Sequence, residues 1–311
     1  TKVIDFLGKK KIFFILSAVV IIAGFVTMGV HKGNGGDALN YSLEFKGGTS
    51  TNVEFNEDMS IEELDEKVVP IIEEISKDAN VQTQKVQGSN QVIFKSATLD
   101  VSQREELNSR LEEEFGVDPE KITAETISST ISSEMRTGAV SAVVVSTVLM
   151  LLYVWFRFKD VRFGASSVAA LVHDVLVVLA FYAAARVSVG NTFIACMLTI
   201  VGYSINATIV IFDRIRENMT SYKTKEELAA IVNRSISQTL SRSIFTSLTT
   251  FIMVAVLYIL GVSSIKEFAL PLMVGIACGT YSSICLASAF WYLLRTRVGG
   301  KKAEKNKKAA K

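Results

Sequence analysis

The run Ile12-Phe-Phe-Ile-Leu-Ser-Ala-Val-Val-Ile-Ile-Ala-Gly-Phe-Val-Thr-Met-Gly-Val30 contains no charged residue. As a helix it can cross the roughly 30 Å of hydrocarbon in a bilayer, which takes about 20 residues. The chain is 49% apolar, with a mean hydropathy of +0.35. Five more apolar runs follow, at residues 138–156, 165–185, 192–212, 244–260 and 268–294. The sequence therefore predicts a polytopic α-helical membrane protein with six transmembrane helices.

Basic residues predict the orientation of these helices. If the N-terminus is cytoplasmic, most of the 33 Lys and Arg residues fall in inside segments or in the long insertion, and the two short outside loops hold only Arg186 and Lys266. The positive-inside rule then places both termini in the cytoplasm. A cleaved signal peptide is the alternative for the first run, which three lysines precede; His31-Lys32 follow where a small-residue cleavage site would be expected.

Residues 31–137 change to the pattern of a water-soluble domain. Two helices are predicted, one beginning at Ser60 and ending near Ile75, the other beginning at Ser102 and ending near Phe115; each start has a Glu three residues later, as in a capping box. Four strands are predicted at 49–55, 80–87, 91–95 and 121–128, with a turn at Gly88-Ser89. The order β-α-β-β-α-β predicts an α+β ferredoxin-like extracytoplasmic domain, which we interpret as a binding module.

The predicted organisation alternates membrane and water-exposed parts. These are a cytoplasmic N-terminus at 1–11, helix 1 at 12–30, the external domain at 31–137, helices 2–6 within 138–294 and a basic cytoplasmic tail at 295–311. We expect the tail to contact anionic lipid and not nucleic acid. All three cysteines fall within predicted helices, where cysteine usually fills space as a small apolar side chain. No catalytic residue, metal site or cofactor is expected, so the sequence does not indicate an enzyme.

Ionisable side chains at membrane depth are the candidate functional residues. A charged group there costs at least about 2.5 kcal/mol on insertion scales, so those that persist usually face a protein interior or a water path. His173-Asp174 lies midway along the third predicted span. Two interpretations stay open for Asp174: it exchanges a proton, or it is bonded to neighbouring helix ends. The other proton-coupling candidates are Asn206 and Asp213 in the fourth span and Arg242 in the fifth, with His173 and Thr246 as supporting residues.

Small residues predict two places of close packing. Gly275, Gly279 and Ser283 recur every four residues in the sixth span, and Gly202 lies in the fourth. Such spacing lets a second helix approach closely. At the entry to the external domain, Phe45-Lys-Gly47-Gly48-Thr49 predicts a tight turn, because glycine readily adopts a positive φ.

The segment Gly202-Tyr-Ser-Ile-Asn206-Ala-Thr-Ile-Val-Ile-Phe-Asp-Arg-Ile-Arg-Glu-Asn218 resembles the signature of SecF, a family of protein-export membrane subunits. Four other parts of the chain match the family in order and spacing. They are Phe45 to Thr49, His173-Asp174, Gln238 to Arg242 and the repeat of small residues that begins at Gly275. The resemblance implies half of an RND-type core in a bacterial or archaeal inner membrane, driven by the proton motive force. It also implies three partners: a SecD-like second half, the SecYEG channel and an unfolded exported polypeptide.

Two departures from the family pattern bear on function. The family usually reads Asp-Phe-Thr-Gly-Gly-Thr where this chain has Glu44-Phe-Lys-Gly-Gly-Thr49. The family usually has Asn-Asp in the fourth span, and this chain has Asn206-Ala207, whose methyl group carries no proton. Three interpretations stay open: Ala207 inactivates the proton step, Asp174 or Asp213 takes over the role, or the chain works without its own proton step.

Two other functions compete with protein export. An RND-type subunit that transports lipids or small molecules would share the helices and the external domain, but such pumps generally carry larger external insertions. A scaffold subunit without its own proton step is the third possibility, and Ala207 keeps it open.

Overall fold

The computed structural model describes residues 3–34, 36–79, 81–86, 89–219 and 224–296. It contains two compact units. We call the first the helical unit, which comprises Thr1–Asn40, Ser141–Ser188 and Thr192–Lys311. The second, the sheet unit, comprises Tyr41–Val140 together with the short segment Val189–Asn191. The predicted lipid contact of the basic tail concerns residues that lie mostly outside the described ranges.

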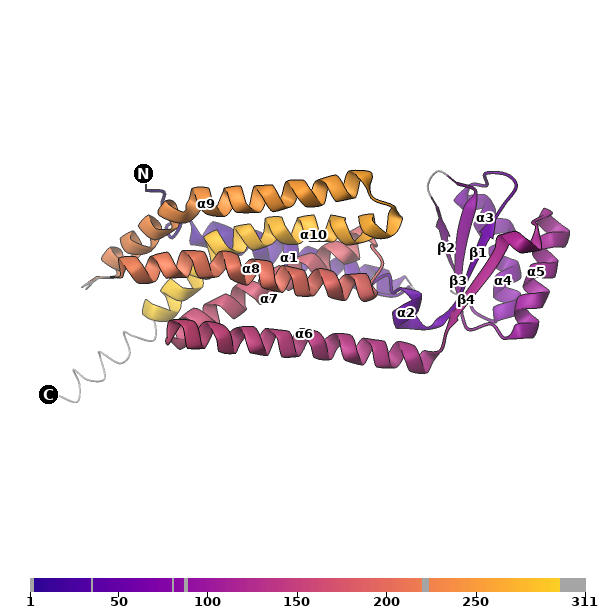
Figure 1. Cartoon of the computed structure of the whole chain (residues 1–311), viewed down its shortest axis with the longest axis horizontal. Coiled ribbons are helices and arrows are strands. Elements are labelled where there is room, and N and C mark those ends of the chain that lie inside the picture. The colour runs from indigo at the N-terminus through magenta and orange to yellow at the C-terminus, as the bar shows by residue number, and fades with distance from the viewer. Residues whose placement is uncertain (1–2, 35, 80, 87–88, 220–223, 297–311) are drawn as a thin grey trace. The chain divides into compact units, whose positions relative to one another are not determined.

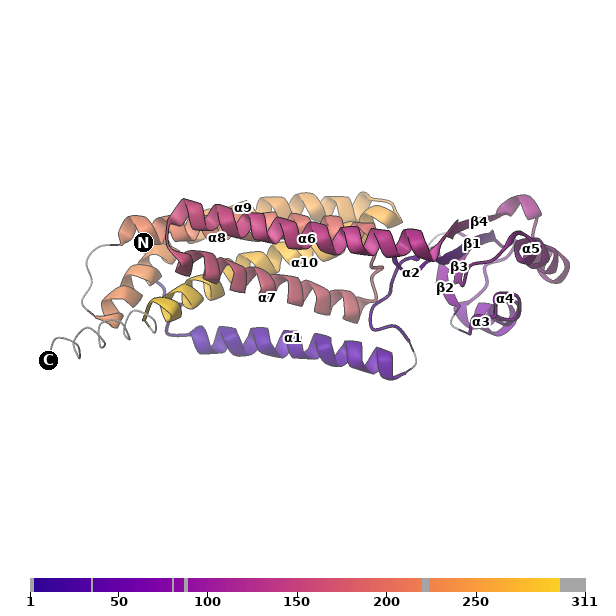
Figure 2. The ribbon, with the colours of Figure 1, turned by 90° about the horizontal axis from the view of Figure 1, so that it is seen from below.

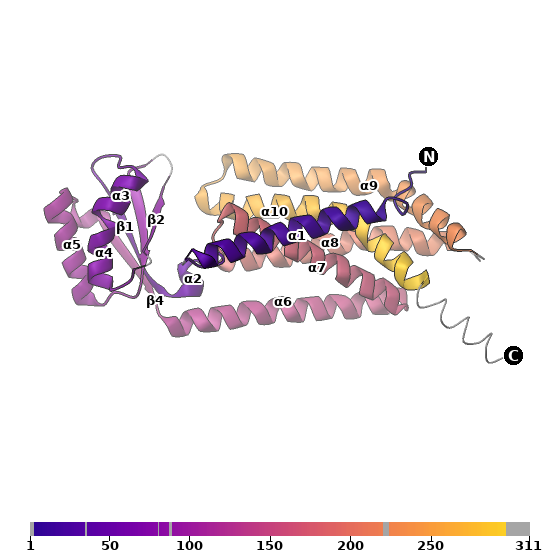
Figure 3. The same cartoon turned by 180° about the vertical axis from the view of Figure 1, so that it is seen from behind.

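Six helices of the described residues are long and apolar enough to cross a membrane. They are α1 (Lys10–Gly33), α6 (Ser129–Phe158), α7 (Val161–Ala185), α8 (Asn191–Asn218), α9 (Lys225–Leu260) and α10 (Ser263–Tyr281) with its continuation. The continuation of α10 is a π-helix over Ser282–Ala287, and the sixth candidate span runs to Thr296. In Figure 3, α1 begins and the last helix ends at the same end of the helical unit, as an even number of spans requires.

The centre of the helical unit is formed by the sixth span, whose apolar window is 61% buried, together with α7 and α8, whose windows are each 44% buried, against 11% for α1. Figure 2 shows α1 running beside α7. Gly24 permits this approach, because a Cβ at that position would overlap Ala180 of α7. The hydroxyl of Tyr281 also donates to the carbonyl of Phe13 at 2.8 Å, which joins α10 to α1. The outward faces of α1, α6 and α9 remain apolar and exposed, as lipid-facing or partner-facing helices require.

Aromatic side chains close one end of the helical unit. Phe163 stacks on Trp291 with ring centroids 4.9 Å apart, and it meets Phe212 edge-on at the same separation. Phe158 adds a second stacked contact with Phe163 at 5.0 Å. These four side chains come from α6, α7, α8 and the last helix, so the cluster fixes the relative register of those helices.

The sheet unit has one antiparallel sheet with three helices over one face (Figure 1). The strands are β1 (Gly48–Glu54), β2 (Gln82–Lys85), β3 (Gln91–Ser96) and β4 (Ile122–Ile127), in the order β2-β3-β1-β4. The helices over the sheet are α3 (Ile61–Lys67), α4 (Val69–Ser76) and α5 (Val101–Phe115). A short helix α2 (Leu43–Lys46) precedes β1, and a 3₁₀ turn at Pro119–Lys121 precedes β4. The order of elements is the predicted one.

Alternate strand residues supply the core of the sheet unit. Val53 and Phe94 are fully buried, and Leu64, Leu107 and Leu111 of the helices cover them. This period of two is what a sheet with one covered face requires. The alternation is clear in β1 and β3, the two central strands of the sheet.

Several predicted boundaries differ from those in the structure. The first predicted helix is divided into α3 and α4, because Pro70 lies at the start of α4 and provides no backbone N–H to continue the preceding helix. The cap of the second predicted helix lies two residues earlier than predicted, because Asp100 and Gln103, and not Ser102, form the capping box. The helix that contains the second predicted span begins at Ser129, before the apolar run at 138–156. Gly88 of the predicted hairpin turn lies outside the described residues.

Candidate functional site

Asp174 is a fully buried carboxylate in the middle of α7. Two hydroxyls donate to its Oδ2 atom: Ser204 from α8 at 2.5 Å and Ser282 from the end of α10 at 2.7 Å. A carboxylate oxygen can accept two such hydrogen bonds at once. Three helices that are far apart in the sequence therefore meet at one carboxylate.

The second carboxylate oxygen, Oδ1, has two further neighbours. The Nδ1 atom of His173 lies 3.0 Å away, and the thiol of Cys278 donates from 3.2 Å. The Nε2 atom of His173 is buried and has no hydrogen-bond partner among the described residues. Asp174 thus has four polar neighbours, and among these only His173 can carry a positive charge.

Sequence reasoning missed three neighbours of Asp174, namely Ser204, Ser282 and Cys278. Cys278 lies 104 residues from Asp174 in the chain, and a cysteine within an apolar helix gives no signal beyond that of a small filler. With His173 and Asp174 it forms a group of nitrogen, oxygen and sulfur donors within 4.8 Å of one another. These donor types are among those that bind Zn²⁺, although no metal site was expected from the sequence.

Close packing of α8 against α10 positions the serine hydroxyls. Gly275 faces Ile200, and Gly279 faces Ser204, whose Cβ would lie 3.3 Å from a Cβ at Gly279. The predicted repeat of small residues therefore contacts α8 as far as Gly279. Beyond it the α-helical spacing ends, because Ser282 begins the π-helix and Ser283 lies fully buried inside it. Wide turns of this type recur at functional sites.

The other predicted proton-coupling candidates do not contact Asp174. Asp213 pairs with Arg157 of α6 at 3.0 Å, with both side chains partly exposed. Asn206, Arg242 and Thr246 are exposed, as is Gly202, and Ala207 is half-buried. Within the described part of the chain, Arg242 has no hydrogen bond or ion pair. The fourth and fifth spans therefore present polar groups outward, away from the helical core.

The glycine motif at the entry to the sheet unit forms a turn, as predicted. Gly47 and Gly48 have φ values of 75° and 123°, which L-residues rarely adopt. Phe45 is buried before the turn, and the hydroxyl of Thr49 accepts from the backbone N–H of Leu99 at 2.9 Å. The motif thus joins α2 to β1 by a backbone that requires glycine.

The segment Val189–Asn191 belongs to the sheet unit because α2 and the residues before it hold it. The backbone N–H of Ser42 donates to the carbonyl of Val189 at 3.0 Å, and the N–H of Asn191 donates to Oε2 of Glu44 at 2.8 Å. A carboxylate at the first residue of α8 also interacts favourably with the helix dipole. The acid of the entry motif therefore caps α8.

Comparisons with known proteins agree with this arrangement. The family described as "Protein export membrane protein SecD/SecF, C-terminal" matches residues 107–297. The SecF translocase subunit of Sebaldella termitidis is 36% identical over 301 residues, which covers 96% of this chain and 94% of that protein. The SecDF subunit of Bacillus subtilis is 34% identical over 94% of this chain, but only 38% of that longer protein is covered.

A solved structure shows the same architecture. The crystal structure of SecDF from Thermus thermophilus, titled as a translocon-associated membrane protein, superposes with a TM-score of 0.77 at 35% identity. The match covers 95% of this chain and 39% of that one. Because the relationship extends over nearly the full chain in both sequence and fold, the chain is a multi-pass membrane protein that belongs to the SecF family of protein translocase subunits.

Proposed function

We propose that the chain assists protein translocation as one six-span half of a larger assembly, paired with a SecD-like half beside the SecYEG channel. The lengths of the relatives support this pairing, since this chain corresponds to 38% of one SecDF protein and 39% of another. The membrane is the inner membrane of a bacterium or archaeon, and both termini are cytoplasmic, as the distribution of basic residues predicts.

The observation that carries the pairing is the exposure of polar groups on α8 and α9. Thr199 and Asn206 are exposed on α8, and Arg242 and Thr246 on α9. Arginine facing hydrocarbon costs at least about 2.5 kcal/mol. A second helical half that covers these groups, or water that it encloses, removes the cost of placing them in hydrocarbon. These faces are therefore the proposed contact with the SecD-like half.

We assign the proton step of this chain to Asp174. The fourth span carries Ala207 where the family usually has the acid, so the buried carboxylate of α7 is the remaining candidate in the core. When charged, it accepts from Ser204 and Ser282; protonation converts one oxygen into a donor and weakens those bonds. Proton uptake would thus loosen α7 from α8 and α10.

Movement of α8 would pass to the sheet unit through Glu44. The first residue of α8, Asn191, is held by Glu44 inside the sheet unit, and the same helix carries Ser204. The sheet unit then acts on the exported polypeptide outside the membrane.

The test is export of an unfolded precursor into vesicles that contain this chain, its SecD-like half and the SecYEG channel. Asp174→Asn is expected to abolish the stimulation of export by a proton gradient, whereas Asp213→Asn, which removes a charge at an exposed pair, retains most of it. A scaffold role is the second candidate, favoured by Ala207. It predicts that neither substitution changes the stimulation, and that outcome would reject the proton step at Asp174.

The lipid or small-molecule alternative gives a different result in the same vesicles. Omitting the chain would then leave precursor export unchanged with or without the gradient. The Ala207→Asp variant restores the acid that the family usually has. If Ala207 inactivates the proton step, export depends on the gradient only in this variant. If Asp174 carries the step, export already depends on the gradient in the original chain.

A further inference from the structure

Three buried side chains of the helical unit bring a nitrogen, an oxygen and a sulfur donor together. His173, Asp174 and Cys278 each offer one metal-ligand atom, and the three atoms lie within 4.8 Å of one another. The Nδ1 and Oδ1 atoms are 3.0 Å apart, Sγ and Oδ1 are 3.2 Å apart, and Sγ and Nδ1 are 3.9 Å apart. The three donors therefore face one another across a space the size of an atom.

These separations match the dimensions of a zinc centre. The point in the plane of the three atoms that is equidistant from them lies about 2.0 Å from each, whereas Zn–N and Zn–O bonds are about 2.0–2.1 Å and Zn–S bonds about 2.3 Å long. A point about 0.8 Å outside that plane gives all three bonds these lengths. No donor atom has to move to admit the ion.

The surroundings of Asp174 hold its carboxylate in the orientation that a metal ligand needs. Its Oδ2 atom accepts from Ser204 at 2.5 Å and from Ser282 at 2.7 Å. The other oxygen, Oδ1, consequently faces His173 and Cys278. Hydrogen bonds to a ligating carboxylate fix its position, and losing one typically lowers metal affinity about 10–100-fold. The donors also belong to two packed helices, α7 and α10, which position ligands more precisely than loops do.

The chemistry of the donors favours a divalent transition metal. Thiolate and imidazole ligands suit Zn²⁺, whereas Mg²⁺ and Ca²⁺ prefer oxygen ligands. Cysteine binds a metal as the thiolate, so binding releases the thiol proton of Cys278 to solvent and uses His173 in its neutral form. The negative charges of Asp174 and Cys278 then balance the charge of Zn²⁺. Neutrality matters at a buried site, because an uncompensated charge there is costly.

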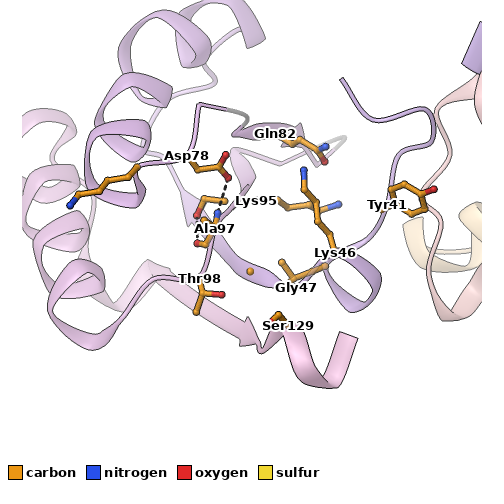
Figure 4. A pocket seen from close by; sticks show the side chains of 13 residues that line it. Tyr41, Lys46, Gly47, Asp78, Gln82, Lys95, Ala97, Thr98 and Ser129 are labelled. Atoms are coloured by element: carbon orange, nitrogen blue, oxygen red, sulfur yellow. Dashed lines mark hydrogen bonds between the residues drawn. The ribbon is translucent and has the colours of Figure 1, made fainter. Parts of the chain in front are cut away.

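A pocket of about 340 Å³ in the sheet unit offers no comparable set of donors (Figure 4). Neither histidine nor cysteine lines it, and its one carboxylate, that of Asp78, accepts from the backbone N–H of Ala97 at 2.8 Å. Lys95 of the same lining donates to Gln84 at 3.1 Å. Within the part of the chain that the structure describes, the mixed donor set is that of the helical unit.

We propose that His173, Asp174 and Cys278 bind Zn²⁺, with a fourth coordination position open to water, as in other sites with three protein ligands. The ion would join α7 to α10 and occupy the Oδ1 atom of Asp174. Under the proposed function, on which this consequence rests, zinc would compete with the proton for Asp174 and stop gradient-driven export. Binding itself does not depend on that function.

The test uses the full chain purified in nanodiscs, freed of metal with a chelator and titrated with Co²⁺, a coloured probe for zinc sites. Because the donors are buried, each addition is followed until the spectrum is constant. We expect a charge-transfer band from thiolate to cobalt that saturates at one ion per chain and disappears when Zn²⁺ is added. Cys278→Ser should remove the band. Cys285→Ser, which replaces a half-buried cysteine outside the donor set, is the matched control and should retain it.

Two further readouts do not depend on the cobalt spectrum of the cysteine variant. Competition with a fluorescent zinc chelator should show at least about tenfold weaker Zn²⁺ binding in His173→Gln, since losing a ligand costs no less than losing an outer hydrogen bond. Saturating Zn²⁺ should move the unfolding of the original chain and of Cys285→Ser to a higher fraction of sodium dodecyl sulfate. Cys278→Ser, checked for the same initial helix content, should show no such shift.

Three outcomes would overturn the metal site: no charge-transfer band in the original chain, an equal band in Cys278→Ser, or equal loss of the band in Cys285→Ser. All binding is measured without a proton gradient, so the result is separate from the export assay. Cobalt binding in a chain whose export is unaffected by Asp174→Asn would reject the proton step and leave the metal site standing. Loss of export in Asp174→Asn without cobalt binding to the original chain would do the reverse.

Discussion

Replacing Gly24 with alanine tests how closely α1 packs against α7. A Cβ at this position would overlap the Cβ of Ala180 and lie 2.7 Å from its Cα. Ordinary carbon contacts lie at about 3.5–4.0 Å, so the two helices must separate by about 1 Å. Ala180 has no rotatable side chain that could move aside. Overpacking of this kind costs typically about 1–3 kcal/mol.

Gly29, on the same helix, is the matched control. A Cβ there meets no atom within 4 Å. Both substitutions raise the intrinsic helix propensity by the same amount, about 1 kcal/mol, so this contribution cancels when the two variants are compared. We therefore expect Gly24→Ala to be less stable than Gly29→Ala by about 1–3 kcal/mol.

The measurement is unfolding of the purified chain in mixed micelles with a rising fraction of sodium dodecyl sulfate, followed by loss of helix content. The Gly24→Ala variant should lose helix at a lower fraction than the Gly29→Ala variant. If the two variants unfold at the same fraction, α1 does not pack on α7 through Gly24, and the close approach described above is refuted.

Three further predictions concern the sheet unit. Phe94→Ala, at a fully buried core position, should destabilise this unit by about 3–5 kcal/mol in urea unfolding, and a loss below about 1 kcal/mol would contradict the packing. Glu44→Gln should accelerate hydrogen exchange at the backbone amide of Asn191 about two- to tenfold, since one exposed hydrogen bond to a charged acceptor is weakened; unchanged exchange would show that Glu44 does not cap α8. Hydrogen bonds from the backbone of Gln103 and from a serine hydroxyl hold the pKa of Asp100 below its usual value, so the cap stabilises α5 above about pH 4 and is lost as the pH falls through the lowered pKa. Amide exchange at Gln103 should therefore show extra acid-induced opening that Asp100→Asn removes, and identical pH profiles would argue against the cap.

The transmembrane helices could be predicted because hydrocarbon imposes one requirement over a long stretch. Over about 20 residues, each apolar run must form its backbone hydrogen bonds within its own helix. A run of this length can be recognised from composition alone. The ends of the helices depend on individual hydrogen bonds and were predicted less well. Ser60 was identified as a helix cap, whereas Asp100 was missed because Ser102 with Glu105 gave the same pattern two residues later.

The contacts of Asp174 show what could not be predicted from the sequence. Asp174 was a candidate because an acid at membrane depth is conspicuous in any sequence. Its neighbours Ser204, Cys278 and Ser282 were not, since each is an ordinary small residue that becomes significant only when three helices meet. The roles of Asp213 and Arg242 in proton coupling stay predictions.

The π-helix at Ser282–Ala287 has a consequence for the phase of the last helix. A π turn holds one residue more than an α turn needs, and one residue corresponds to about 100° of rotation. Residues before the wide turn face Asp174, and Trp291 after it faces Phe163. A regular α-helix over the same residues would turn Trp291 by about 100° away from its partner. The irregular turn therefore lets one helix satisfy two sets of contacts that an ideal helix would present on different sides.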